Sequence, residues 1–221
     1  MNSPGNLLKR ATNEKELGKA LAQLLELDPA LKHMVAPNGK LPNRFNEPGF
    51  KGLAHIVIAQ QVSKISADAV YGRFIQMLEQ PTAEDFLAAG QPVWVAMGLT
   101  RAKQACLSGL AAAIVDGRFP INALADLPAE ETFEHLTALK GIGPWTAEVY
   151  LLLVLGHADI FPAGDIALQE GVKRALQLEK RPEAKEARVY AERWTPLRGI
   201  AARLFWDYYG RVKQGENASA I

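Results

Sequence analysis

The chain has 221 residues, and 48% of them are hydrophobic, so it is long and apolar enough to form one large domain or two small lobes. Its 25 basic and 24 acidic residues nearly balance, which argues against a strongly basic coat for nucleic acid and against an acidic disordered tail, although a local basic face remains open. The single cysteine, Cys106, excludes an intramolecular disulfide, a Cys-ligated zinc site and a four-cysteine iron–sulfur cluster. We expect it to be a small core residue.

No apolar segment typical of a signal peptide is visible near the N-terminus. The longest apolar run, Val149 to Leu155, is far shorter than the roughly 20 residues that a membrane-spanning helix needs. We therefore expect a cytoplasmic protein with no membrane association.

Apolar residues recur at helical spacing along most of the chain. A first helical segment covers residues 13–35, with a break at Asp28 and Pro29. A second runs from about Phe50 to Leu78, and the chain near Gln61 could interrupt it. Since no strand-like alternation and no long-period repeat appear, the sequence predicts an all-α protein. The remaining predicted helical segments cover residues 82–90, 100–117, 129–141, 165–178 and 186–210, the first of them capped by Thr82.

The segment "LKGIGPWTAEVYLLLVLG", residues 139–156, predicts a helix–hairpin–helix arrangement. The first helix would end at Leu139 because Gly141 can adopt the left-handed cap conformation. Pro144 is tolerated in the first turn of the next helix, where no intrahelical donor is required. The exposed N–H groups of that turn would form an anion site suited to a phosphate. On these residues alone, an ordinary helix–helix turn remains the alternative.

Three motifs occur together: the hairpin at residues 139–147, "FPAGD" at residues 161–165 and "IVIAQQVSKISA" at residues 56–67. Together they resemble the DNA glycosylase superfamily that combines a helix-hairpin-helix motif with a Gly/Pro-rich loop and an aspartate (HhH-GPD). In the second motif, Asp165 follows Gly143 by 22 residues. The third motif resembles the helix carrying the family's DNA wedge. Trp145 and the run at residues 190–206 make the chain most similar to the 3-methyladenine DNA glycosylase II branch.

The resemblance implies that Asp165 is the catalytic carboxylate. Cleavage of a glycosidic bond develops positive charge on the sugar, which a fixed carboxylate stabilises while it activates water. Asp165 also lies at a helix N-terminus, where the helix dipole favours a negative charge. A plain N-cap role is the alternative, and the two roles can coexist. Trp145 stands where the strand-cleaving relatives carry a lysine nucleophile, so we expect a monofunctional enzyme without AP-lyase activity.

The resemblance also implies a base pocket and a DNA wedge. Trp145 and Trp206 would line the pocket by stacking on electron-poor alkylated bases, although Trp206 could instead be a core residue. Gln61 falls at the wedge position, with Ser63 and Lys64 beside it, and would fill the gap that a flipped base leaves. A helix-surface glutamine is the alternative for Gln61.

The hairpin would contact the DNA backbone, with Gly141, Gly143 and Thr146 as phosphate-binding residues. By resemblance, the backbone carbonyls of Thr137, Leu139 and Ile142 would hold a monovalent cation. We expect no other cofactor and no iron–sulfur cluster. No metal-ligand spacing is present among the four histidines, which are His33, His55, His135 and His157.

The expected architecture is a single HhH-GPD domain, residues 1–221, made of two helical lobes with a cleft between them. Residues 50–160 would form a barrel-like lobe ending in the helix-hairpin-helix at about 133–155. Residues 1–49 and 161–221 would form the other lobe, with Asp165 at the edge of the cleft.

The expected function is excision of alkylated purines of the 3-methyladenine type from double-stranded DNA in base excision repair, by a nucleoid-associated monomer. Two alternatives remain open at this point: a glycosylase for another lesion, such as ethenoadenine, hypoxanthine or a mismatched base, and a helix-hairpin-helix protein that binds DNA without catalysis. The choice among 3-methyladenine, 7-methylguanine, ethenoadenine and hypoxanthine depends on the shape of the pocket.

Overall fold

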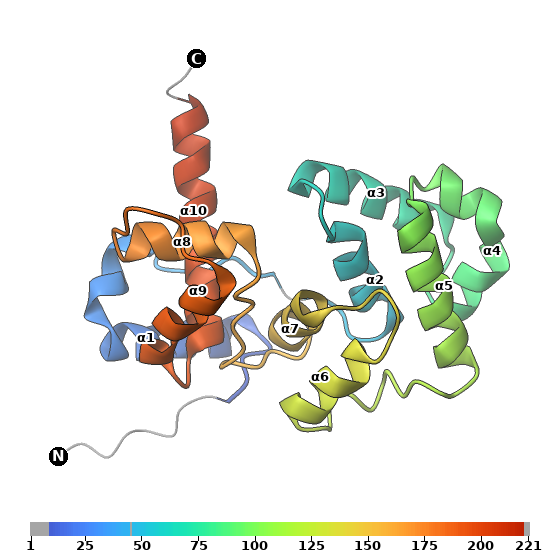
Figure 1. Ribbon diagram of the computed structural model, residues 1–221, viewed down its shortest axis with the longest axis horizontal. Coiled ribbons are helices and arrows are strands. Elements are labelled where there is room, and N and C mark those ends of the chain that lie inside the picture. The colour runs from blue at the N-terminus through green and yellow to red at the C-terminus, as the bar shows by residue number, and fades with distance from the viewer. Residues whose placement is uncertain (1–8, 45, 219–221) are drawn as a thin grey trace. The chain divides into compact units, whose positions relative to one another are not determined.

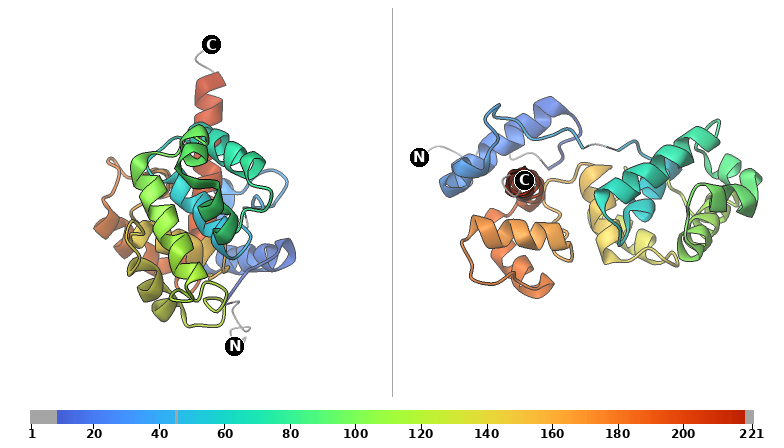
Figure 2. Two further views of the ribbon diagram at one scale, coloured as in Figure 1. Left: turned by 90° about the vertical axis from the view of Figure 1, so that its right-hand side faces the viewer. Right: turned by 90° about the horizontal axis from the view of Figure 1, so that it is seen from above.

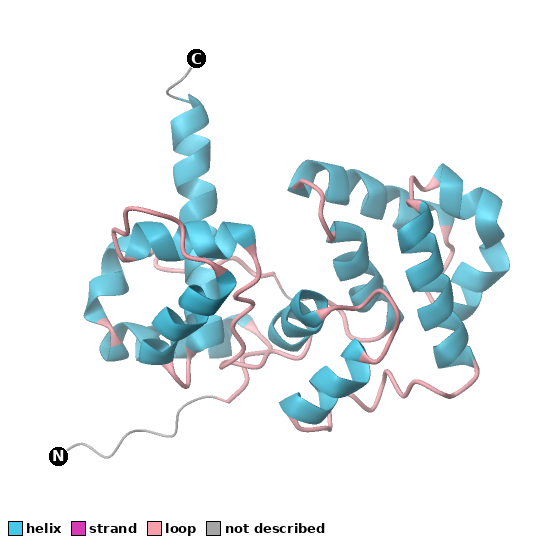
Figure 3. Ribbon diagram, in the orientation of Figure 1, coloured by secondary structure: helices cyan, strands magenta, loops and turns pink. Residues whose placement is uncertain are grey.

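The computed structural model describes residues 9–44 and 46–218, and within these ranges the chain forms helices joined by loops, without strands (Figure 3). The predicted all-α class is therefore confirmed. The chain divides into two compact units. One comprises Met1–Phe45 with Leu155–Ile221, and the other comprises Asn46–Val154. The second unit overlaps most of the predicted middle lobe, residues 50–160, but residues 155–160 fall in the first unit.

The first unit is organised around α10 (Arg198–Ala218), which contacts both α1 (Glu14–Leu27) and α8 (Ile166–Ala175). Figure 1 labels these helices, and the right-hand view of Figure 2 looks along α10, with α1 on one side of it and α8 on the other. Every residue from Ile200 to Phe205 is buried. Burial all round is typical of a central core helix. The unit also contains η1 (Pro29–Met34), α9 (Ala184–Ala191) and η2 (Glu192–Trp194).

The break predicted at Asp28 and Pro29 is present, and Asp28 also contacts a residue far along the chain. Asp28 caps η1 by accepting a hydrogen bond from the Ala30 N–H at 3.2 Å. Its second carboxylate oxygen accepts one from Trp194 Nε1 at 2.9 Å. Trp194 is fully buried, as expected for a core residue, and this bond satisfies the only polar atom of its side chain.

The second unit is organised around α2 (Phe50–Ala59), which contacts α3 (Lys64–Met77), α5 (Arg101–Val115) and α7 (Pro144–Leu153). Its apolar side chains are buried nearly all round, as those of α10 are in the first unit. The unit is completed by α4 (Ala83–Ala96), which packs on α5, and by α6 (Ala129–Thr137), which packs on α7.

One predicted interruption is present, and one predicted helix boundary differs from the structure. The helical run from Phe50 to Leu78 is interrupted near Gln61, as the sequence indicated, because residues 60–63 leave the helical path and Gln61 adopts a left-handed φ of +54°. The helix expected to end at Leu139 ends at Thr137. Beyond Thr137, a hydrogen bond of the 3₁₀ type joins the Leu139 N–H to the Leu136 carbonyl, three residues earlier, at 3.2 Å. The predicted cap at Thr82 is present, with its side chain accepting from the Asp85 N–H at 3.1 Å.

Among the described residues, no helix combines the length and the apolar character needed to cross a membrane.

Candidate active site and hairpin

Asp165 is held in one orientation by two donors. As the N-cap of α8, its Oδ1 accepts a hydrogen bond from the Leu168 N–H at 2.8 Å. The same oxygen accepts a second from Trp206 Nε1, on α10, at 2.9 Å. Because one donor is backbone and the other a half-buried indole, the carboxylate cannot rotate without losing both bonds. The structure therefore brings two of the predicted site residues together.

The loop before Asp165 is braced by its own backbone and by α8. Within residues 161–165, the Ala163 N–H donates to the Phe161 carbonyl at 2.7 Å, and the Asp165 N–H donates to the Pro162 carbonyl at 2.9 Å. The buried amide of Gln169, one turn into α8, donates to the Ala163 carbonyl at 2.8 Å. Phe161 and Pro162 are themselves buried. The loop thus presents Asp165 from a rigid base.

A close helix contact places Trp206 beside Asp165. Gly171 of α8 faces Phe205 of α10, and a Cβ on Gly171 would lie 2.7 Å from the Phe205 Cβ and 3.0 Å from its carbonyl oxygen. Only glycine allows the two helices to approach this closely. Trp206 directly follows Phe205, so the same approach brings its indole within reach of the carboxylate.

An ion pair ties the start of α10 to the segment that leads into the loop. Arg198 donates from Nε to Asp159 Oδ1 at 2.9 Å and from Nη2 to Oδ2 at 2.8 Å. The hydrogen bond from Asp159 raises the pKa of Arg198, while burial opposes the shift. The two-pronged geometry fixes direction as well as distance. Arg198 and Asp159 were not singled out by sequence, since nothing in either segment shows that the two would meet.

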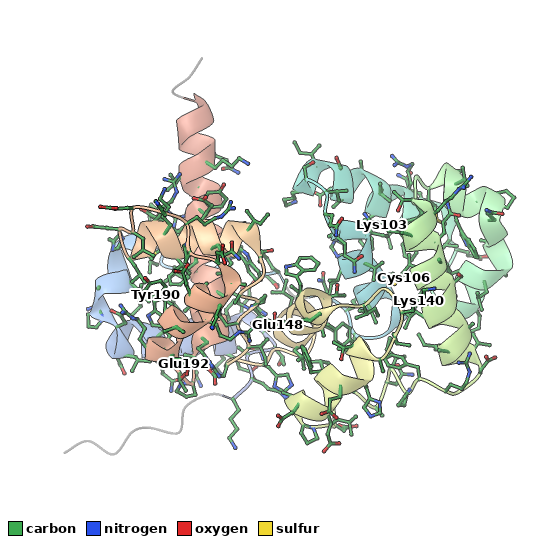
Figure 4. All side chains as sticks on the ribbon, in the orientation of Figure 1. Lys103, Cys106, Lys140, Glu148, Tyr190 and Glu192 are labelled. Atoms are coloured by element: carbon green, nitrogen blue, oxygen red, sulfur yellow. The ribbon has the colours of Figure 1, made fainter. Side chains whose placement is uncertain are left out.

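The hairpin of the second unit connects α6 to α7. Gly141 has a φ of +91°, and a Cβ there would lie 2.9 Å from both Cβ and Sγ of Cys106 on α5. Figure 4 shows Cys106 beside the loop that carries Lys140. The turn is closed by the Ile142 N–H, which donates to the Leu139 carbonyl at 3.1 Å, and Ile142 is buried. Cys106 is the predicted core residue, but its contact with the hairpin was not foreseen.

The start of α7 has the geometry expected of an anion site. Pro144 occupies the first turn, as predicted, and Gly141 and Gly143 are exposed. The first helical hydrogen bond runs from the Ala147 N–H to the Gly143 carbonyl at 3.1 Å, so the preceding N–H groups are those that a helix leaves without intrahelical partners. Thr146 is only 2% exposed, and its hydroxyl accepts a hydrogen bond from Gln60 at 2.8 Å.

Trp145, the other predicted pocket residue, is half-buried in the first turn of α7. It belongs to the second unit, whereas Asp165 and Trp206 belong to the first. Each unit thus carries one of the two tryptophans.

The predicted wedge residues lie in the turn between α2 and α3. Gln61 is exposed at the turn. Ser63 is the N-cap of α3, accepting from the Ser66 N–H at 3.2 Å, and Lys64 pairs with Asp68 one turn on. Two exposed apolar side chains flank them and were missed by sequence analysis: Val62, 43% exposed, and Ile65, 83% exposed.

The predicted cation site consists of carbonyls that end α6 and form the turn after it. Such carbonyls lack helical donors and are hard oxygen ligands suited to an alkali cation. The Leu139 carbonyl accepts from the Ile142 N–H and keeps a second lone pair. The backbone carbonyls of Thr137, Leu139 and Ile142 are therefore chemically compatible with a monovalent cation. Among the described residues, no cluster of three His, Cys, Asp or Glu side chains could hold a metal ion.

The fold and site define an all-α helix-hairpin-helix protein with a braced loop and an aspartate at a helix N-terminus. Residues 54–197 match the family model of the HhH-GPD superfamily base excision DNA repair proteins, and the chain belongs to this superfamily.

Similar proteins include the DNA-3-methyladenine glycosylase 1 of Schizosaccharomyces pombe, which is 32% identical over 197 residues, 86% of each chain. A solved structure of the 3-methyladenine DNA glycosylase from that organism, in complex with abasic DNA, matches with a TM-score of 0.78 and 31% identity, over 85% of this chain and 95% of that one. A probable bifunctional transcriptional activator/DNA repair enzyme of Mycobacterium tuberculosis is 30% identical over 85% of this chain but only 39% of its own length.

Proposed function

We propose that this chain is a monofunctional DNA glycosylase of base excision repair, which removes alkylated purines of the 3-methyladenine type from double-stranded DNA. The observation that carries the proposal is the fixed carboxylate of Asp165, held by the Leu168 N–H and by Trp206 at the N-terminus of α8. A carboxylate fixed in this way can stabilise a developing positive charge, which binding of DNA alone does not require. The relatives named as 3-methyladenine glycosylases support the same class of substrate.

The chemistry assigned to Asp165 is hydrolysis of the glycosidic bond. As the bond between the sugar C1′ and the base nitrogen breaks, its electron pair leaves with the base and positive charge develops on the sugar. The Asp165 carboxylate stabilises that charge and accepts a proton from the water that attacks C1′. Its second role as helix cap, together with the bond from Trp206, explains how it is held.

Trp145 and Trp206 are proposed to line the base pocket, where their rings stack on an electron-poor base. Because Trp145 occupies the position at which a lysine nucleophile would stand, we propose that no Schiff base forms and the strand is not cut.

The hairpin is proposed to hold the DNA backbone through the N–H groups at Gly143 and Thr146 and the open surface at Gly141, with a monovalent cation on the carbonyls of Thr137, Leu139 and Ile142. The cation would supply positive charge next to a phosphate. Gln61, at the exposed turn, is proposed as the wedge that fills the gap left by a flipped base. We further propose that the protein acts on DNA as a nucleoid-associated monomer.

The test is release of free base from methylated double-stranded DNA, comparing wild type with Asp165→Asn. Asparagine keeps the cap and the acceptor for Trp206, so only the charge is removed. We expect the single-turnover rate to fall by about 10²–10³-fold, with the Kd for DNA unchanged. Asp126→Asn, at an exposed carboxylate in the loop before α6, is the matched control and should keep the wild-type rate.

A D165N rate within a few-fold of wild type would remove Asp165 from the chemistry. If wild type binds DNA but frees no base from methylated or ethenoadenine-containing duplexes, the glycosylase proposal itself fails. Nicking of abasic DNA without alkali, and trapping of the enzyme on that DNA by borohydride, would contradict the monofunctional assignment.

A further inference from the structure

The side chain of Gln60, at the C-terminal end of α2, bridges the two sides of the hairpin. Its Nε2 lies 3.1 Å from the Gly141 carbonyl oxygen and 2.8 Å from Thr146 Oγ1. These partners are 81 and 86 residues further along the chain, and they lie before and after the exposed Gly143.

The chemistry of the two partners fixes the orientation of the amide. A backbone carbonyl can only accept, so the NH₂ group of Gln60 must face Gly141. That nitrogen carries two hydrogens, and one is available for each partner. Thr146 is buried, so its hydroxyl accepts in a setting where loss of the donor would leave a polar atom without water. The hairpin turn is therefore clamped by a single side chain.

Two further contacts make the clamp rigid. Cys106 lies directly against Gly141 at the hairpin turn. The α2 end that carries Gln60 is itself fixed, because Lys103 Nζ on α5 donates to the Ile58 carbonyl at 2.7 Å. Gln61, the proposed wedge residue, follows Gln60 at once and has its left-handed φ of +54°. The clamp thus ties the hairpin and the wedge turn to each other.

We infer that Gln60 is a positioning residue for DNA binding, which holds the N–H groups of the hairpin and the wedge turn in one fixed arrangement through its bonds to Gly141 and Thr146. The inference rests on the proposed role of the hairpin in binding DNA. It assigns no contact with the lesion to Gln60, so loss of its amide should weaken binding and leave the bond-breaking step intact.

The experiment measures DNA affinity against salt for Gln60→Leu, which keeps the size of the side chain and removes both donors. Binding to an undamaged duplex is followed by fluorescence anisotropy between about 50 and 200 mM salt. We expect Kd to rise by about ten-fold, the effect of losing bonds to a buried hydroxyl and a carbonyl. The slope of log K against log salt should become shallower by about 0.9 for each phosphate contact that is lost. The single-turnover rate on methylated DNA at saturating protein should stay within two-fold of wild type.

Two comparisons complete the design. Gln76→Leu, at an exposed glutamine of α3, is the matched control and should keep both the affinity and the salt slope. Thr146→Val removes one of the two acceptors, and we expect Q60L and T146V to be non-additive in Kd, because both break the same bond.

A wild-type Kd and salt slope in Q60L would overturn the inference. So would a variant that is less stable to heat but binds with the wild-type salt slope when assayed well below its Tm, since Gln60 would then act in folding alone. Failure of the proposed function is seen separately, in wild-type protein that binds DNA and frees no base.

Discussion

The Asp165 region and the hairpin are built by different means. Around Asp165, a backbone N–H of α8 and the Trp206 side chain of α10 converge on one carboxylate oxygen, and most of the loop behind it is buried. In the hairpin, the surface is backbone, with Gly141 and Gly143 exposed and the supporting side chains of Gln60 and Cys106 behind it. The first arrangement fixes an atom, and the second fixes the directions of N–H groups.

Under the proposed function, this difference separates two tasks. A carboxylate that stabilises developing charge must stay in place while the bond breaks, because electrostatic stabilisation depends on preorganised groups. Phosphate binding needs correctly directed N–H groups and space for the backbone to approach. Substitutions near Asp165 should therefore change rates, and substitutions in the hairpin should change affinities.

The sharpest test of this separation is Trp206→Phe. Phenylalanine keeps an aromatic ring but removes the Nε1 donor to Asp165, so the carboxylate loses a charge-assisted hydrogen bond. We expect the single-turnover rate to fall by about 10–100-fold, equivalent to roughly 1.5–3 kcal/mol, with an unchanged Kd for undamaged DNA. A large loss of DNA affinity in this variant would contradict the division between the two regions.

The converse test is Gly141→Ala. The new Cβ would meet Cys106 at 2.9 Å and stand on a residue with a φ of +91°, so the turn must deform. We expect Kd for duplex DNA to rise by about ten-fold and stability to fall by about 1–3 kcal/mol, with a normal single-turnover rate at saturating protein. Adding Cys106→Ala removes the Sγ contact and should relieve part of the crowding, and a double variant no better than G141A would assign the effect to backbone strain and the remaining contact with the Cβ of residue 106.

A third prediction concerns the close approach of α8 and α10. Gly171→Ala places a Cβ 2.7 Å from Phe205, which we expect to lower the free energy of unfolding by about 1–3 kcal/mol and to disturb the Asp165–Trp206 bond. Urea denaturation measures the first effect and the single-turnover rate the second. Gly18→Ala in α1, where a Cβ meets nothing within 4 Å, is the control and should be neutral or stabilising by up to about 1 kcal/mol. Equal behaviour of the two variants would show that the helices can move apart freely.

The last prediction concerns the pH dependence of stability and involves neither the rate nor the DNA affinity. His157 lies shortly before the Asp165 loop, and burial, with a smaller contribution from the Arg10 charge, lowers its pKa from 6.5 to about 4. Between these values the unfolded chain binds a proton that the folded chain does not, so stability falls as pH drops from about 6.5 towards 4, by at most about 1.4 kcal/mol per pH unit.

The check is urea unfolding of wild type and His157→Gln across this range. The variant should show a shallower loss of stability towards acid. Some acid sensitivity should remain, because burial also lowers the pKa of His55 in the second unit. Identical pH profiles would mean that His157 is not protected from protonation in the folded chain.

Local signals in the sequence determined the helices and their starts. Thr82 and Asp165 cap as predicted, and Pro144 begins a helix, because capping and the fixed φ of proline depend on residues within one turn. The motif spacing likewise led to the family. Cys106 was correctly predicted as a core residue, since burial follows from residue type and helical spacing.

Contacts between segments far apart in the chain were decided only by the tertiary structure. Trp206 meets Asp165 across 41 residues, and Gln60 meets Thr146 across 86. Gln60, which was not singled out by sequence, shows the limit. Gln60 follows buried Ile56 and Val57 at helical spacing, which was a signal that its side chain turns inward. The helical period predicts which face of a helix is buried. It does not predict which residue of another helix that face contacts, because this depends on how the two helices pack.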